Sequence, residues 1–263
     1  MRRYLRIYWH MVKQNINRDL QFRSDFWLAV ATQLAWFGMQ ILFFRILFNQ
    51  TVEINGWSFE HILVLLAVFL LIEMVVIGLF MHNFARMPSY ISDGELDFLL
   101  LKPVDAQFLS SLRYFSTNSL FNILPPLLLL FVGFGSLGIT AGLGQILLFA
   151  VGFVSSVVIL YSLWFITVIS LFWINKVFEI HEFFLSLFHF VKYPSSIYRG
   201  FVKHFFSFVF PIILTVTVPA QILLSTLENT AKLLWLPLIA AITFALSRLI
   251  WKAGLRRYVS ASS

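Results

Sequence analysis

Residues 59–81 read FEHILVLLAVFLLIEMVVIGLFM, an apolar run with one carboxylate, Glu73, well inside it. A transmembrane helix needs about 20 mostly apolar residues, because the hydrocarbon core of a bilayer is roughly 30 Å thick. This run has the required length and is flanked by polar segments. It therefore predicts a helix that crosses a membrane, and so predicts that the chain is an integral membrane protein.

The composition of the whole chain agrees with this prediction. Of the 263 residues, 60% are hydrophobic and 12% are charged, and the mean hydropathy is +0.86. A water-soluble domain of this length needs more polar surface than that. The sequence has no cysteine, which excludes disulfides, a thiol nucleophile and cysteine-ligated metal centres. The net charge of +7 comes from basic residues beside apolar runs, which favours membrane topology over nucleic-acid binding.

The sequence predicts an all-α fold with six transmembrane helices. The expected spans are approximately residues 26–48, 59–81, 108–134, 144–174, 205–227 and 233–251. Pro211 and Pro219 interrupt the fifth span. A broken or re-entrant helix is compatible with this pattern, because prolines are tolerated in a membrane where protein or water satisfies the freed carbonyl groups.

Basic residues indicate the orientation, since cytoplasmic loops carry an excess of lysine and arginine. If the spans alternate, the basic segments around residues 2–23, 86–102, 176–203 and 252–257 all fall on one side. The opposite connections, at residues 49–58, 135–143 and 228–232, contain only one lysine or arginine, Lys232. Both termini are therefore predicted to be cytoplasmic.

Two segments outside the spans are amphipathic. In residues 1–25, apolar side chains recur at helical spacing from Tyr4 to Val12 with arginines between them, which predicts a helix in the headgroup plane. A solvated basic tail that only sets the topology is the alternative. The connection at residues 175–204 is long and aromatic, and it is interpreted as an in-plane or interdomain helix ending near Pro194.

Motifs that suggest enzymatic chemistry lack the context that it requires. Residues 133–138, GFGSLG, match a dinucleotide-binding pattern but follow an apolar span rather than a strand, so they are interpreted as a tight external turn. In HEFFL, residues 181–185, leucine stands where a zinc protease needs its second histidine. No nucleotide-binding P-loop is present. We therefore expect no enzyme activity and no catalytic residue, cofactor or metal in this chain.

Glu73 is the one carboxylate predicted to lie deep in a span. A charge at membrane depth costs about 2.5–3.5 kcal/mol on insertion scales unless it faces protein or water. Glu73 is therefore either a pathway or gating residue, or a carboxyl that pairs with arginine or serine within the bundle.

The connection after residue 91 contains SDGELDFLLLKPVD, residues 92–105. Ser92 and Glu95 have the spacing of a capping box, which predicts a helix start. Leu96, Leu99 and Leu100 would form an apolar stripe, and Pro103 would end the helix. Such a helix is suited to docking into a groove of another protein, and the alternative is that it lies against the spans of this chain.

The order of these features resembles the permease subunits of type-2 ABC transporters, the ABC-2 family. The resemblance extends over essentially the whole chain. Its most specific part is the loop of the form G-E-L-D-x-L-L-L-K-P; FPIILTVTVPAQILL (residues 210–224) and WKAGLRRYVSAS (residues 251–262) support it.

The resemblance implies a dimer of this chain with a second copy or a sister permease, standing on two ATPase subunits that bind ATP and magnesium. It also implies that residues 1–25 form a connecting helix and residues 92–101 a coupling helix. The implied ATPase-coupling residues are Ser92, Asp93, Gly94, Glu95, Leu96, Asp97, Leu99, Leu100, Lys102 and Pro103. Glu73, Pro211 and Pro219 are the candidate pathway or gating residues.

We therefore expect a multi-pass permease of the bacterial cytoplasmic membrane that exports a lipid, glycolipid, drug or peptide. Its partners would be ABC ATPase subunits, a second permease and membrane lipid, with no nucleic acid. An ion-gradient-driven transporter or channel is the first alternative, and it requires several ionisable groups at membrane depth. A membrane assembly factor without transport activity is the second.

Overall fold

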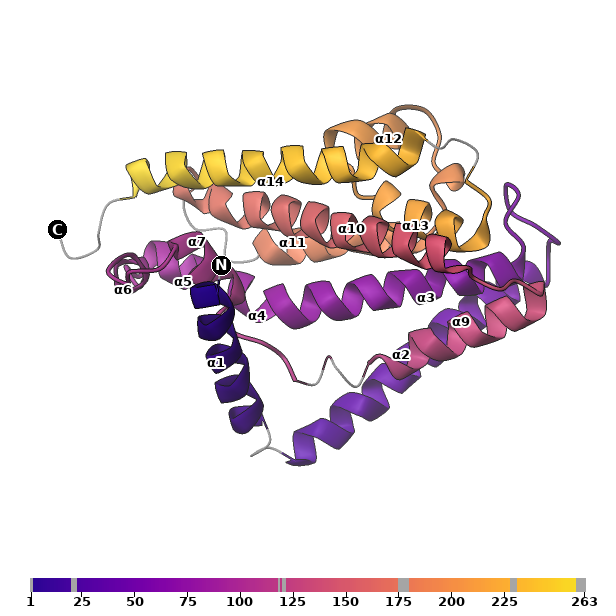
Figure 1. Cartoon of the computed structure of the whole chain (residues 1–263), viewed down its shortest axis with the longest axis horizontal. Helices are drawn as coiled ribbons and strands as arrows, with labels where there is room; N and C mark the ends of the chain where they lie inside the picture. Colours follow the sequence, from indigo (N-terminus) through magenta and orange to yellow (C-terminus); the bar gives the residue numbers. More distant parts are fainter. Residues whose placement is uncertain are drawn as a thin grey trace.

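A computed structural model describes residues 2–19, 23–117, 119, 122–174, 180–227 and 231–258. Among these residues the regular structure is helical, apart from an isolated bridge between Ile54 and Trp57. Figure 1 shows the long helices running beside one another. The elements are α1 (Arg2–Asp19), α2 (Arg23–Phe48), α3 (Phe59–Val76), η1 (Ile77–Met81), α4 (His82–Phe84), α5 (Met87–Ser92), α6 (Leu96–Leu100), α7 (Ala106–Leu112), α9 (Leu124–Leu137), α10 (Leu143–Ile169), η2 (Ser170–Phe172), α11 (Ile180–Phe188), η3 (His189–Lys192), η4 (Ser195–Ile197), α12 (Gly200–His204), η5 (Phe205–Val209), α13 (Leu214–Leu224) and α14 (Ala231–Arg257).

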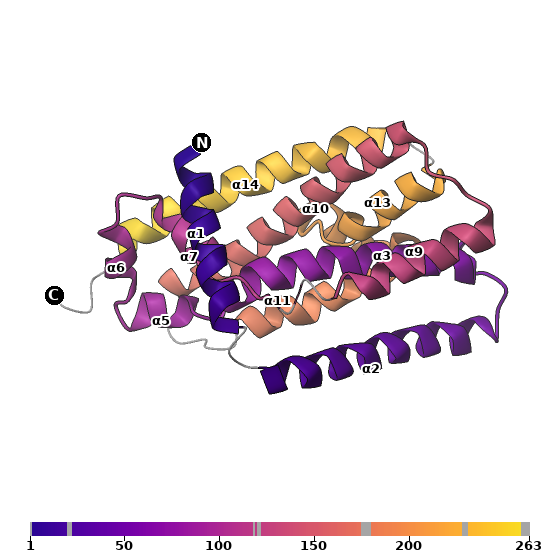
Figure 2. The ribbon, with the colours of Figure 1, turned by 60° about the horizontal axis from the view of Figure 1, so that its bottom comes forward.

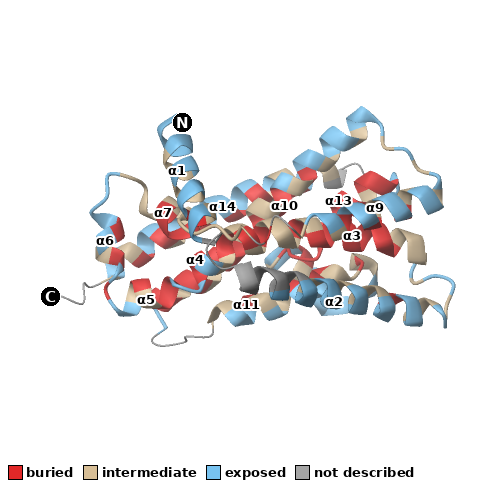
Figure 3. Ribbon diagram, turned by 90° about the horizontal axis from the view of Figure 1, so that it is seen from below, coloured by how far each residue is buried: buried red, intermediate tan, exposed pale blue. Residues whose placement is uncertain are grey.

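Helix α3 is the central helix of the bundle because it is apolar on every side. Every residue from Ile62 to Leu70 is buried, and Figure 3 shows this helix among its neighbours in the interior. It packs against α9, α10 and α13. The apolar run that predicted a membrane span therefore also forms the core of the protein.

The glycines of residues 133–138 do not form one turn as predicted. Gly133 and Gly135 lie inside α9, and only Gly138, with φ of +66°, ends the helix in the left-handed region. A Cβ at Gly133 would be 2.8 Å from Cγ2 of Val64 on α3. The small size of Gly133 therefore allows α9 and α3 to pack closely, which the turn interpretation overlooked.

A second group of helices, α10, α13 and α14, packs beside α3. Gly152 of α10 lies against α13, since a Cβ there would be 3.3 Å from Cδ1 of Ile222 and 3.5 Å from Cγ of Pro219. The side-chain amide of Gln145 donates to the carbonyls of Ile222 and Leu223 at 2.9 and 2.6 Å. The carbonyl of Leu223 near the end of α13 gains a partner in this way, and that of Ile222 gains one besides the amide of Ser225.

Helices α1 and α2 lie at the edge of the bundle. Only 6% of the residues of the candidate span Ala31–Phe48 in α2 are buried, against a buried share of 67% for Phe59–Ser92. Figure 2 shows α2 set apart from the other long helices. Helix α1 runs across their direction near α5 and α7 in Figures 1 and 2. Residues 2–19 are thus helical, and a connecting helix at the membrane surface over residues 1–25 stays a prediction.

The described residues contain four helices long and apolar enough to cross a membrane, or five if one bent pair is counted. The four are Ala31–Phe48, Phe59–Ser92, Leu143–Phe172 and Leu233–Arg257. The all-helical membrane fold is thus supported, but the count of six spans is not reproduced.

The expected span at residues 108–134 is interrupted. Helix α7 ends at Leu112 and α9 begins at Leu124. Pro125 and Pro126 restrict the start of α9, because proline is accepted in the first turn of a helix and not in its interior. The prediction of one continuous helix was wrong because the apolar run after the prolines was joined to the polar residues before them.

The backbone of this interruption is held by Asn83, which is fully buried. Its side-chain nitrogen donates to the carbonyl of Tyr114 at 2.7 Å, and its side-chain oxygen accepts from the amide of Tyr114 at 2.9 Å. The amide of Ser116 donates to the carbonyl of Gly78 at 3.0 Å. Irregular backbone is tolerated at membrane depth only where protein satisfies its polar groups in this way.

The predicted fifth span, residues 205–227, does not cross the bundle. Elements α12 with η5, and α13, form two arms bent by 88°. One arm begins near Asn55, whose side-chain amide donates to the carbonyl of Ser196 at 3.2 Å, and the other ends beside Gln145. The connection between α2 and α3, which contains Asn55, and the start of α10, which contains Gln145, both lie at the end of the bundle opposite α5 and α6 in Figure 1. The pair is therefore re-entrant, which the prolines had allowed.

Elements α11 and η3 run along the bundle in place of the predicted fifth span. Phe184 stacks on Trp164 of α10 with ring centroids 5.1 Å apart, and Tyr193 meets Phe44 near the end of α2 at 5.9 Å. The helix ends near Pro194 as expected, but Ser196 and Lys203 lie beside Asn55. The prediction that the whole connection at residues 175–204 lies on the same side as Lys102 was therefore wrong for its second half. Residues 175–179 lie outside the described residues. Of the aromatic side chains that made it resemble a surface helix, Phe184 and Phe188 pack in the interior, whereas Phe183 and Phe190 are exposed.

Asn83→Ala is expected to destabilise the protein by about 1–3 kcal/mol, because the buried amide and carbonyl of Tyr114 would lose their partner. The measurement is the unfolding transition of the purified chain in detergent. Asn49→Ala, which removes the same side chain from an exposed position, is the control. Equal transitions for the two variants would contradict this role of Asn83.

Candidate functional site

The turn between α5 and α7 differs locally from the predicted capped helix. Ser92 is the last residue of α5, and Glu95 precedes α6 without a side-chain capping bond. Gly94, with φ of +77°, reverses the chain between the two helices, a conformation that glycine adopts without strain. The capping-box prediction is therefore wrong, and the expected helix at residues 92–101 is reduced to Leu96–Leu100.

The leucines of α6 do not form one exposed stripe. Leu96 and Leu99 are 0% and 1% exposed and belong to the core of this chain. Phe98 and Leu101 are 70% and 82% exposed, with Leu100 beside them at 43%. Spacing at i and i+3 places both pairs on single helix faces, so the sequence pattern identified the helix but not its free face.

The remaining predicted residues of this turn surround the exposed apolar side chains. Asp93, Glu95 and Lys102 are exposed, and Asp97 is half-buried. Pro103 follows α6 as expected, and its carbonyl accepts a hydrogen bond from the guanidinium of Arg3 in α1 at 2.9 Å. The turn, defined here as residues 93–103, therefore lies at one end of the molecule (Figure 3) and is attached to α1.

Asp105 connects the turn to the last helix. Its side chain accepts from the amide of Phe108 at 2.9 Å and so caps α7. Its two carboxylate oxygens also accept from Arg248 of α14 at 2.9 and 2.7 Å, the bidentate geometry that gives strong ion pairs. The hydrogen bond from Arg248 is the main reason that the pKa of Asp105 lies below its ordinary value.

A polar cluster extends from this ion pair to α10. Arg248 donates to the side-chain oxygen of Gln107 at 3.0 Å, and the nitrogen of Gln107 donates to the hydroxyl of Tyr161 at 3.0 Å. Ser111 lies 3.0 Å from the same hydroxyl. Helices α7, α10 and α14 are thus joined beside a mostly apolar cavity of about 350 Å³.

Arg248 and Gln107 are functional candidates that the sequence did not single out. Arg248 stands within an apolar helix, as LSRLI in residues 246–250, and an arginine at such a position signals a partner carboxylate. Only the structure identifies that carboxylate as Asp105, because the two residues are far apart in the chain.

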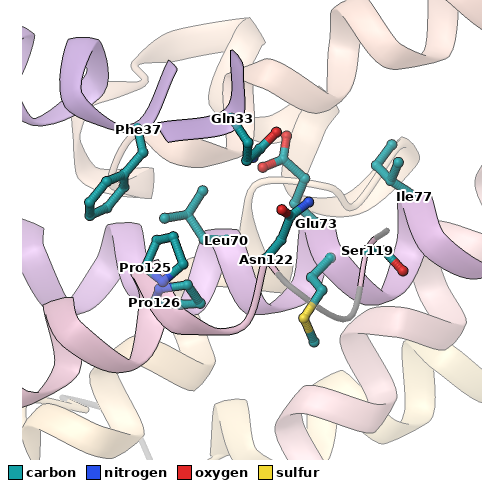
Figure 4. A pocket seen from close by; sticks show the side chains of 10 residues that line it. Gln33, Phe37, Leu70, Glu73, Ile77, Ser119, Asn122, Pro125 and Pro126 are labelled. Atoms are coloured by element: carbon teal, nitrogen blue, oxygen red, sulfur yellow. The ribbon is translucent and has the colours of Figure 1, made fainter. Parts of the chain in front are cut away.

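Glu73 lines a cavity of about 110 Å³ between α2, α3 and the start of α9. Figure 4 shows the polar ends of Gln33, Glu73 and Asn122 gathered together, with Phe37 and the two prolines beyond them. The side chain of Glu73 has no hydrogen bond or ion pair to another described residue. The expected pairing with arginine or serine is therefore not observed in the described part of the chain. The ten lining residues are Gln33, Phe37, Leu70, Glu73, Met74, Ile77, Ser119, Asn122, Pro125 and Pro126.

The two candidate prolines lie in and beside the re-entrant pair. Pro211 stands at the bend between η5 and α13, and Pro219 is buried inside α13 against Gly152. Neither lines the cavity of Glu73, so the three candidate pathway residues do not form one site.

The comparison with protein families agrees with this arrangement. A family model described as ABC-2 family transporter protein matches residues 34–262. The chain belongs to the ABC-2 transporter family. The resemblance found in the sequence is thus confirmed, and this ABC-2 protein is a multi-pass membrane protein of a family whose permease subunits work with ABC ATPases. No curated protein matches the sequence.

The ion pair of this ABC-2 protein predicts a specific loss of stability in acid. The pKa of Asp105 is lower in the folded state than its ordinary value of 3.8. Its contribution to the stability of the fold is therefore complete above pH 3.8 and disappears as the pH falls through the folded pKa. Asp105→Asn should therefore lower the melting temperature near neutral pH and flatten its decline between about pH 5 and pH 3.

The measurement is the melting temperature as a function of pH, with Asp93→Asn as the matched control because Asp93 is exposed. A decline in Asp105→Asn as steep as in the wild type would show that the ion pair does not stabilise the fold.

Proposed function

We propose that this ABC-2 protein is the permease subunit of an ATP-driven exporter in the bacterial cytoplasmic membrane. Its substrate is amphipathic or hydrophobic, in the class of lipids, glycolipids, drugs and peptides. A separate ABC ATPase binds ATP and magnesium and hydrolyses the nucleotide. Family membership supports the permease role, and the apolar bundle supports the location in a membrane.

The observation that carries the proposal is the turn at residues 93–103. Phe98 and Leu101 expose apolar surface of the kind that a partner's groove covers. Two residues after the turn, Asp105 binds Arg248, and the polar cluster continues to Tyr161. A displacement of the turn by an ATPase would therefore be transmitted directly to α14 and α10.

The arrangement of charges supports a cytoplasmic location for the turn. The basic helix α1 is attached to Pro103, and the basic end of α14, with Arg256 and Arg257, follows Arg248. Cytoplasmic segments carry such an excess of basic residues. Lys203 and Arg199 lie at the opposite end of the bundle. They reduce the excess of basic residues at the end of the turn without reversing it.

Helix α2 supports the proposal of a second permease, which is either a copy of this chain or a sister subunit. Its exposed apolar side chains include Leu34, Trp36, Met39 and Leu42. Lipid or another transmembrane helix must cover such a surface. In the proposed mechanism the interface between the two permeases alternates between inward-open and outward-open states.

The pair of substitutions Phe98→Asp and Leu101→Asp is expected to weaken binding of the ATPase at least about tenfold. Each large apolar side chain contributes about 1.5–3 kcal/mol when it is buried, and about 1.4 kcal/mol corresponds to a tenfold change. The measurement is co-purification of the ATPase from native membranes, together with the ATPase activity of the complex.

Phe201→Asp is the matched control, because Phe201 is 80% exposed on α12 at the other end of the bundle. Leu96 and Leu99 are unsuitable for this test, because their replacement would damage the core. Stoichiometric ATPase with the doubly substituted chain would exclude the turn as the docking site.

A further inference from the structure

The cavity of Glu73 combines a carboxylate with an apolar wall. Gln33, Ser119 and Asn122 contribute polar side chains beside Glu73. Phe37, Leu70, Met74, Ile77, Pro125 and Pro126 form the rest of the lining. Figure 4 shows the ends of Gln33 and Asn122 close to the carboxylate, with Phe37, Leu70 and the two prolines on one side of them and Ile77 on the other. The cavity is therefore amphipathic, with the polar ends of Gln33 and Asn122 gathered at the carboxylate and apolar side chains around them.

The cavity lies at membrane depth. Glu73 is fourteen residues after Phe59, the first residue of α3, which is about 21 Å along a helix. The hydrocarbon core is roughly 30 Å thick, so Glu73 lies about two-thirds of the way across from the start of α3. A carboxylate at this depth is costly unless a counter-charge or water compensates it.

The described residues that line the cavity supply no counter-charge. None of them is a lysine, arginine or histidine. Lys192 of η3 is the cation whose field reaches Glu73, but its side chain does not line the cavity. His189 precedes it on the same element. The amides of Gln33 and Asn122 are neutral and can orient their oxygens toward a cation or their nitrogens toward the carboxylate.

We propose that this cavity binds the positively charged head of an amphipathic amine. The carboxylate of Glu73 acts as the counter-ion, the amide and hydroxyl side chains accept hydrogen bonds from the ammonium group, and the apolar wall receives the adjoining hydrocarbon. This assignment rests on the proposed transport function, since it names the class of molecule that the permease moves.

A metal ion fits the cavity less well. Hard cations such as calcium require six to eight oxygen ligands, whereas the described residues of the lining offer one carboxylate, two amides and one hydroxyl. The ring of Phe37 and the adjacent apolar surface suit the hydrocarbon of an organic cation, which gains from apolar burial as well as from charge. The half-apolar lining therefore favours an alkylammonium group.

The position of the cavity also provides a route of entry. Gln33 and Phe37 belong to α2, the least buried of the candidate spans. The other walls belong to α3 and to the start of α9, which pack closely together. Movement of α2 away from α3 would open the cavity to the lipid without disturbing the core.

The proposal is tested by measuring binding of dodecylamine to the full chain in lipid nanodiscs, without an ATPase. Equilibrium dialysis of the labelled amine against loaded and empty nanodiscs separates binding from partitioning into lipid. We expect saturable binding by the wild type that dodecanol, which has the same chain and no charge, does not displace. Glu73→Gln should weaken it at least about tenfold, and Glu73→Asp should retain more of it.

Glu60→Gln is the matched control, because it makes the same change at the start of α3 outside the cavity, and it should bind like the wild type. Absence of saturable binding in the wild type, displacement by dodecanol, or unchanged affinity in Glu73→Gln would overturn the proposal. Gel filtration establishes that each variant is folded. If binding depends on Glu73 but vesicles containing the ATPase complex do not export the amine, the site assignment holds and the transport function fails.

Discussion

Satisfaction of backbone polar groups inside an apolar bundle is the constraint on which the rest of this structure depends. A continuous helix satisfies its own backbone polar groups. The chain, however, leaves helical geometry between α7 and α9 and at the end of α13. Asn83 binds both polar groups of Tyr114 in the first case, and Gln145 binds the last carbonyls of α13 in the second. The side-chain amides of buried Asn83 and half-buried Gln145 make the interrupted path compatible with a membrane.

The interruption after α7 has a functional result. Because α7 is a separate short helix, Asp105 can cap it and also bind Arg248. The turn at residues 93–103 is then connected to the spans through charged and polar side chains rather than through the chain alone. The same irregular backbone brings Ser119 and Asn122 to Glu73, so one departure from helical structure contributes to both candidate sites.

The sequence predicted the helices whose apolar runs are continuous, and α3, α10 and α14 begin and end near the expected residues. It failed where a residue's partner decides the structure. Hydropathy joined residues 108–134 because it does not register that Asn83 binds Tyr114. Phe184 and Tyr193 were assigned to a surface connection because their partners, Trp164 and Phe44, are distant in sequence. Within the site, spacing found α6 but could not distinguish Leu96 from Phe98, since both faces are apolar.

The sparse packing of α2 has a consequence for how the protein responds to its bilayer. The apolar segment Ala31–Phe48 has 18 residues, about 27 Å of helix, close to the thickness of a hydrocarbon core. A membrane of different thickness creates hydrophobic mismatch, which a helix relieves by tilting at a small cost per ångström. Because α2 shares little surface with the bundle, its tilt can follow the lipid while the other helices keep their positions. The width of the Glu73 cavity would then depend on bilayer composition.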